Sequence, residues 1–174
     1  RLIFALIILL EAGIAVNALE NLPVSITYSG SSGYSLVERT NLRRYVNGKY
    51  VGLTSREVRS FISPAQAPRP SLEAEDVHWY DGSFYVVEAA KSNAHETASG
   101  IHDSIPSVFS IAPDGSLSMF RVNGYPSFRS FPAFTRQKIR PGDAWKATAE
   151  RAVDPLNKGV FTRIPMEVTY QFTG

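Results

Sequence analysis

Alternating apolar and polar residues predict strands along most of this chain. Val24, Ile26 and Tyr28 recur at every second position, as do the apolar residues between Ile164 and Phe172. A period of two is that of a strand with one buried face. By the same pattern we expect strands in residues 34–46, 49–63, 76–80, 83–91, 107–111 and 116–122. Residues 144–153 fit either a strand or a short helix.

Turn signals separate several of these segments. Asn47-Gly48 and Asp81-Gly82 each stand between two expected strands. Such pairs are typical of two-residue hairpin turns, because type I′ turns need positive φ at both central positions. Residues 112–115, Ala-Pro-Asp-Gly, predict a third hairpin.

The fold class that follows is all-β, built from successive hairpins. We expect eight or nine antiparallel strands in a strongly curved sheet, either a half-barrel or a sandwich. The remaining segments are expected to be loops: a proline-rich one at 64–74, a small and polar one at 92–106, and one rich in Pro and Phe at 123–143.

Composition narrows the possibilities only a little. Hydrophobic residues make up 44% of the chain and charged residues 20%, with a formal net charge of +2, which is ordinary for a globular domain and identifies no partner. The absence of Cys excludes disulfides, thiolate metal sites and a cysteine nucleophile.

The amino terminus predicts an export signal. An apolar run from Leu2 to Leu10 is followed by Val16-Asn17-Ala18, which fits signal-peptidase cleavage after Ala18. We therefore expect a signal peptide at 1–18 and a single β-rich domain at 19–174 that continues beyond the last residue. Glu11 interrupts the apolar segment, so a buried helix or an anchor is the alternative.

Catalytic and metal-binding patterns are not found. His95 and His102 lie seven positions apart beside Glu96 and Asp103, whereas a metalloprotease helix places two His four apart. We expect a solvated loop there, and His78 at the rim of a strand. There is no nucleophile elbow, phosphate loop or dinucleotide fingerprint. We therefore predict a protein that is not an enzyme and has no cofactor or metal.

Basic residues gather in the first expected hairpin. A contact with an anionic surface is one hypothesis, and a solvated hairpin face is the other. Because Glu38 and Glu57 are interspersed and stacking aromatics are sparse, we do not expect nucleic-acid binding. The candidate residues are Arg39, Arg43, Arg44, Arg56 and Arg59, with Lys49 near the turn.

Residues 34–63 and the segments FPAFTRQKIRPGDAWKATAERAVDP and RIPMEVTYQFTG resemble spirochaete-type (Treponema-like) envelope proteins of the outer membrane protein A (OmpA) family. The resemblance implies a β-rich domain in the periplasm or at the outer membrane. Peptidoglycan is then expected as a partner only through a downstream domain that these residues do not include. The matching positions are Phe131, Pro132, Pro141, Gly142, Asp143, Trp145, Val153, Asp154, Ile164, Pro165, Val168, Tyr170 and Phe172.

The family pattern has physical correlates and leaves two functions open. Pro-Gly-Asp predicts a turn before a strand, Pro165 predicts an edge or bulge, and we expect Trp145 to be buried against Val168 or Tyr170. One function is a non-enzymatic structural or interaction domain of the cell envelope. The alternative is an exported carrier that encloses a lipid or other apolar ligand. An apolar concavity favours the carrier, and a filled interior favours the structural domain.

Overall fold

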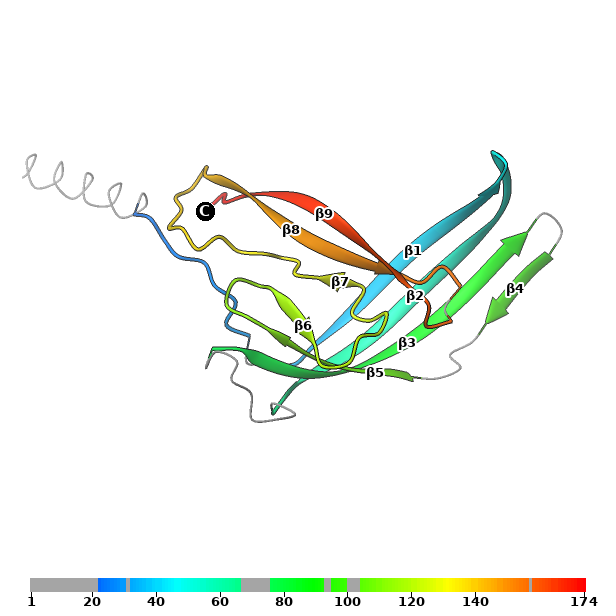
Figure 1. Cartoon of the computed structure of the whole chain (residues 1–174), viewed down its shortest axis with the longest axis horizontal. Coiled ribbons are helices and arrows are strands. Elements are labelled where there is room, and N and C mark those ends of the chain that lie inside the picture. The colour runs from blue at the N-terminus through cyan, green and yellow to red at the C-terminus, as the bar shows by residue number, and fades with distance from the viewer. Residues whose placement is uncertain (1–21, 31, 67–75, 93–94, 100–103, 157) are drawn as a thin grey trace, which may run out of the picture.

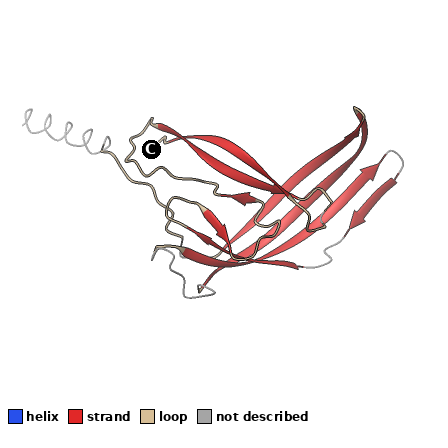
Figure 2. Cartoon of the chain, viewed as in Figure 1, coloured by secondary structure: helices blue, strands red, loops and turns tan. Residues whose placement is uncertain are grey.

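The structure is a computed structural model that describes residues 22–30, 32–66, 76–92, 95–99, 104–156 and 158–174. The predicted signal peptide therefore lies outside the described residues. Those residues form strands and loops without a helix (Figure 2), which confirms the all-β class. In this part of the chain there is accordingly no helix that could span a membrane. The strands are β1 (Tyr34–Val46), β2 (Lys49–Ala65), β3 (His78–Ser92), β4 (His95–Ser99), β5 (Ser104–Ile111), β6 (Leu117–Met119), β7 (Phe128–Arg129), β8 (Ala144–Val153) and β9 (Thr162–Gln171).

Two antiparallel sheets make up the fold. The larger is a strongly curled half-barrel with the order β1-β2-β3-β5-β6, and β4 also pairs with β3. The smaller has the order β7-β8-β9. Figure 1 shows the long β8–β9 ribbon approaching β1 and β2 at one end and rising away from them at the other. The architecture is therefore a half-barrel with a second small sheet laid across it.

The first predicted hairpin is confirmed. Asn47 and Gly48 have φ values of 49° and 75°, the positive pair that a type I′ turn requires. They join β1, of 13 residues, to β2, of 17. The register shifts between Arg44 and Tyr45, which stand opposite Gly52 and Tyr50. The extra residue of this bulge strengthens the local twist near the turn.

The second predicted hairpin is wrong. Strand β3 runs straight through Asp81 and Gly82, and Gly82 pairs with Ile62 on β2 and with Ser107 on β5. This glycine leaves space instead of forming a turn: a Cβ there would lie 2.8 Å from the ring of Phe84. Since β3 has partners on both sides, its central position outweighs the local turn signal.

The third predicted hairpin is confirmed, and residues 144–153 prove to be a strand rather than a helix. Gly115 N donates to Ala112 O at 2.8 Å and closes the turn between β5 and β6. Two other expectations are wrong. Residues 24–28 make only a single bridge, from Val24 to Ile139, and the polar segment expected to be a loop contains β4.

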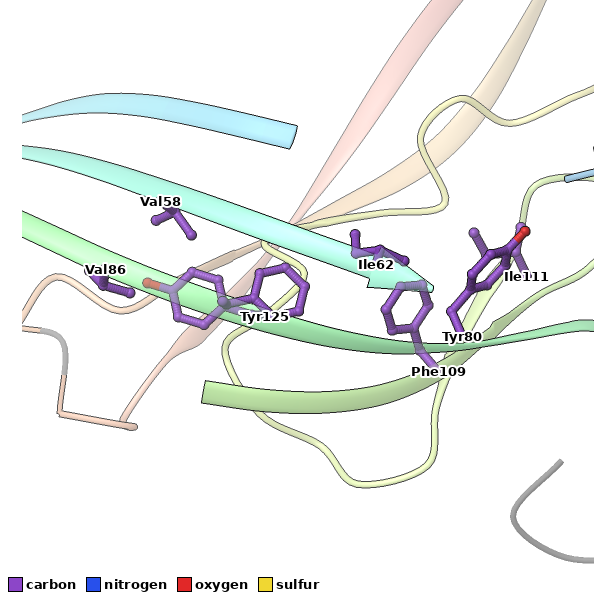
Figure 3. Close-up of a cluster of buried hydrophobic side chains, with 8 residues drawn as sticks. Val58, Ile62, Tyr80, Val86, Phe109, Ile111 and Tyr125 are labelled. Atoms are coloured by element: carbon purple, nitrogen blue, oxygen red, sulfur yellow. The ribbon is translucent and has the colours of Figure 1, made fainter. Parts of the chain in front are cut away.

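The core lies on the concave face of the half-barrel (Figure 3). It stacks Tyr80 on Phe109, with centroids 5.7 Å apart, and Phe84 on Tyr125, with centroids 5.4 Å apart. Side chains of this size contribute on the order of 2–3 kcal/mol each when removed from water. The cluster consists of Val58 and Ile62 from β2, Tyr80, Phe84 and Val86 from β3, Phe109 and Ile111 from β5, and Tyr125 from the loop before β7.

Candidate functional site

An apolar cleft of about 640 Å³ lies beside the core, at the end of the half-barrel where β1 begins and β2 ends. One wall is the concave face of the large sheet, and the other is the segment 126–132 around β7. A volume of this size suits a small organic ligand. Most of the lining is apolar: Tyr28, Tyr34, Leu36, Ile62, Ile111, Leu117, Pro126, Phe128, Phe131 and Pro132.

The alternation of β1 places its side chains in this cleft. Tyr34 and Leu36 stand opposite Ile62 and Ser60, so they share the concave face with the core. Yet Leu36 keeps 49% of its surface exposed. An inward-facing leucine is normally covered by the opposing layer. Here the protein's own side chains do not fill the space.

The opposite wall is aromatic. The rings of Phe128 and Phe131 lie 5.7 Å apart, and Phe131 lies 6.2 Å from Tyr170 of β9. Phe131 is exposed although it lines the cleft. The small sheet therefore contributes Phe128 of β7 to the aromatic wall and supports Phe131 through Tyr170.

Tyr28 and Tyr34 are the tyrosines of the wall, and Tyr28 is hydrogen-bonded to the buried Tyr80. The hydroxyl of Tyr28 donates to that of Tyr80 at 2.7 Å, which donates to the carbonyl of Gly30 at 2.5 Å. Burial, and then the neighbouring Tyr28, raise the pKa of Tyr34 to about 12. Burial likewise raises the pKa of Tyr80, with the hydrogen bond from Tyr28 adding to it. Tyr34 and Tyr80 are therefore neutral at physiological pH.

Glu38 marks the far end of the cleft. Its carboxylate also lines a polar cavity of about 190 Å³ between the two sheets. It accepts hydrogen bonds from Arg151 at 2.9 Å, from Thr40 at 3.2 Å and from Ser127. Because Arg151 of β8 is one of these donors, the carboxylate ties β1 to β8.

Arg56 forms an ion pair within the large sheet and a hydrogen bond to the end of the small one. Arg56 is buried, and its Nε donates to Glu88 at 2.5 Å while its Nη1 donates to the backbone oxygen of Asp154 at 2.6 Å. The side chain of Asp154 accepts from the backbone N–H of Leu156 at 3.2 Å and of Gly159 at 2.6 Å. These contacts fix the end of β8 against β2.

The five candidate arginines do not form one surface. Arg39 and Arg59 both bind Glu57 at 2.7 Å on the convex face, and these hydrogen bonds, that of Arg59 most, lower the pKa of the Glu57 carboxyl. The prediction that Arg56 contacts an anionic surface is wrong, because its side chain points inward and is buried. Arg43 and Arg44 are exposed near the hairpin turn. Strand parity separates residues that the sequence places together.

Trp145 is half-buried, not buried as expected. It stands opposite Tyr170 in the β8–β9 register and stacks on that ring with centroids 5.2 Å apart. Its Nε1 donates to the oxygen of Ala133 at 3.0 Å. Val168 is half-buried opposite Ala147. None of Trp145, Val168 and Tyr170 lines the cleft, whereas Pro165 lies on an edge strand as expected.

Among the described side chains, the histidines form no acid–base arrangement. His78 is half-buried, with its ring 5.9 Å from that of Tyr28. His102 and Asp103 lie outside the described residues, and the described part of the chain has no cluster of metal ligands.

Sequence reasoning missed the cleft itself. Its residues come from segments far apart in the chain, and the only sequence signal was the run of Phe and Pro around Phe131. Comparisons of this chain with protein-family models, with curated proteins and with solved structures found no match. The likeness to OmpA-family proteins therefore stays a prediction.

Proposed function

We propose that this protein is a non-enzymatic binding domain that takes an apolar ligand into the cleft beside its aromatic core. The observation that carries the proposal is the half-exposed Leu36 on the concave face, facing a space of about 640 Å³. Filling that space with a ligand removes apolar surface from water, which is favourable at about 25 cal/mol per Å².

The lining also indicates the character of the ligand. Tyr28 and Tyr34 offer hydroxyl groups at one end, and Glu38 is the only carboxylate that lines the cleft among the described residues. The other charged lining residue, Arg39, is held by Glu57 on the convex face. A mainly hydrocarbon molecule with one hydrogen-bonding group fits this distribution better than a strongly charged one.

The test is a titration with a neutral apolar fluorophore, N-phenyl-1-naphthylamine. We expect saturable binding by the wild type and a loss of about tenfold or more in Leu36→Trp, because the indole fills the cleft. Ile164→Trp is the matched control, since Ile164 on β9 is 46% exposed, close to the 49% of Leu36, but lies outside the cleft. Absence of saturable binding, or equal loss in both variants, would contradict the proposal.

A structural role in the cell envelope is the second candidate. The observation that favours it is the pair of contacts that fix the small sheet on the half-barrel, the ion pair of Arg151 with Glu38 and the hydrogen bond from Arg56 to the backbone oxygen of Asp154. These make a rigid body suited to holding partners at fixed positions. If the fluorophore does not bind and the domain still recovers envelope proteins after crosslinking in cells, this role is supported instead.

Export is part of both candidates. We propose that residues 1–18 direct the protein to the periplasm or the outer membrane and are then removed. Amino-terminal sequencing of the exported form should begin at Leu19. Recovery of only the unprocessed chain in the membrane fraction would contradict this proposal.

A further inference from the structure

The turn end of the β1–β2 hairpin carries apolar side chains that nothing covers in the described structure. This hairpin tip, residues 42–53, reaches beyond the small sheet (Figure 1). Tyr45 is 57% exposed, Tyr50 is 46% exposed, and Val46 between them is exposed as well. The two tyrosine rings meet edge to face with centroids 5.8 Å apart. Exposed aromatic pairs on a projecting turn are unusual for a surface that only meets water.

The charges of the hairpin tip are all of one sign. Between Leu42 and Leu53 the charged residues are Arg43, Arg44 and Lys49, and all three are exposed. Among the described residues none of them forms an ion pair, whereas Arg39 and Arg59 in the same hairpin share Glu57. The positive charges of the tip therefore have no ion-pair partner among the described residues, whereas the two arginines of the convex face share a carboxylate.

A groove of about 430 Å³ lies behind the tip and has the same character. Its walls include Leu42, Leu53 and Leu156, with Arg43 and Arg44 beside them, and no carboxylate lines it among the side chains that the structure describes. Lys91 also lines it and stands opposite Glu96 in the β3–β4 register. The groove can take an apolar chain next to an anionic group.

We propose that the hairpin tip docks on an anionic lipid surface. Tyrosine rings favour the boundary between lipid headgroups and hydrocarbon, because one end is apolar and the hydroxyl is polar. Basic side chains next to them are attracted to anionic headgroups within a Debye length. Val46 at the turn and the leucines of the groove fit acyl chains. Nucleic acid fits less well, because the edge-to-face tyrosines leave no flat platform for stacked bases.

Vesicle sedimentation tests the proposal with the full chain. The tip variant is Arg43→Gln, Arg44→Gln, Lys49→Gln, and the matched control removes three charges elsewhere: Arg39→Gln, Arg59→Gln, Lys146→Gln. On phosphatidylcholine vesicles with about one quarter phosphatidylglycerol, we expect the tip variant to lose about tenfold or more in partitioning and the control to stay within about twofold of wild type. The amino-terminal apolar run is common to all three proteins and cancels.

The outcomes separate the sources of anionic chemistry. Binding that weakens with salt and is absent on pure phosphatidylcholine supports docking. Equal loss in the two triple variants, equal binding to neutral vesicles, or displacement of the protein by inorganic phosphate or by single-stranded DNA at equal charge would overturn it.

Contact depth gives a second, independent readout. Because the chain has no Cys, Val46→Cys and Val122→Cys can each be labelled with one polarity-sensitive dye. Both positions are exposed, and Val122 lies in the loop between β6 and β7. We expect the emission at position 46 alone to shift to the blue on anionic vesicles. An equal shift at both positions, or none at 46, would overturn the proposal.

Discussion

The two ends of the β1–β2 hairpin follow one antiparallel register in opposite surroundings. Where β2 ends, Val58 and Ile62 are buried beneath the aromatic core. Near the turn, Tyr45 and Tyr50 also pair across the two strands, but they remain exposed. Alternation decides which face a side chain occupies, and the layer opposite decides whether it is buried. At the tip no such layer is present among the described residues.

The same difference divides the charges. In the middle of the hairpin, Arg56 is buried, and its hydrogen bonds are accepted by the carboxylate of Glu88 on the neighbouring β3 and by the backbone oxygen of Asp154 after β8. At the tip, Arg44 shares the concave face with Arg56 and is exposed. The buried end provides stability, whereas the exposed end is free to interact. Mutations at the two ends should therefore have very different costs.

The largest contrast is expected between Phe109 and Tyr45. Phe109 is fully buried against Tyr80, so Phe109→Ala should lower the free energy of unfolding by about 3–5 kcal/mol. Tyr45→Ala should cost less than about 1 kcal/mol, because it removes only an exposed aromatic pair. Urea denaturation followed by circular dichroism measures both. Similar costs would mean that the tip is covered in solution and would erase the contrast.

The next effect is expected at Arg56. Arg56→Leu leaves the carboxylate of Glu88 without its ion-pair partner. This uncompensated charge should lower the free energy of unfolding by about 3 kcal/mol. Changing both Arg56 and Glu88 to Leu should cost less than the single change, since no uncompensated charge remains. Arg44→Leu is the control on the same face, with an expected change below about 0.5 kcal/mol. The contrast fails if the Arg44 and Arg56 single variants shift the urea midpoint equally.

The turn itself should have an intermediate effect. Gly48 has a φ of 75°, and a Cβ there would meet no atom within 4 Å, so Gly48→Ala should cost about 1 kcal/mol through backbone strain alone. Gly124 also has open space for a Cβ, but its φ is not positive. Gly124→Ala should therefore be neutral or slightly stabilising. A thermal midpoint that falls equally in both would show that strain at the turn is not the cause.

The smallest effect is a pH dependence at the cleft. Burial raises the pKa of Tyr34 to about 12 in the folded state, against a usual value of about 10. Its contribution to stability is thus complete below about pH 10 and is lost as the pH rises through about 12. In a difference titration at 295 nm between wild type and Tyr34→Phe, the absorbance difference should stay flat up to about pH 11 while the protein is folded. A midpoint near the usual value would place Tyr34 in open water.

Local patterns in the sequence predict most of the strands, and their limits are physical. Asn47-Gly48 and Asp81-Gly82 carry the same turn signal, yet only the first is a turn. The difference lies in the partners: β3 has a strand on each side, and at Gly82 a missing side chain gives space to Phe84. The sequence pattern did not predict β4, because its residues are polar and small. Its strand conformation depends on pairing with β3.

The cleft could not be predicted for a related reason. Leu36 and Phe131 are unremarkable in their own segments, and the half-barrel alone brings them to one space. The basic residues of the first hairpin show the opposite case. They are close in sequence, which suggested one surface, but the alternation of the strands places them on different faces. The prediction that Trp145 packs on Tyr170 is confirmed, but the small sheet has one open face, so Trp145 is only half-buried.

The segment 22–30 has a consequence for the order of folding. It precedes every strand, but Val24 bonds to Ile139, and Tyr28 bonds to Pro113 through its backbone and to Tyr80 through its ring. The β1–β2 hairpin can close at once across two residues, whereas this segment must wait until distant partners are in place, since closing a long loop costs entropy before any contact forms. We therefore expect it to dock last. Because Tyr28 lines the cleft, the cleft is complete only when the first described part of the chain has joined partners 52 or more positions further along.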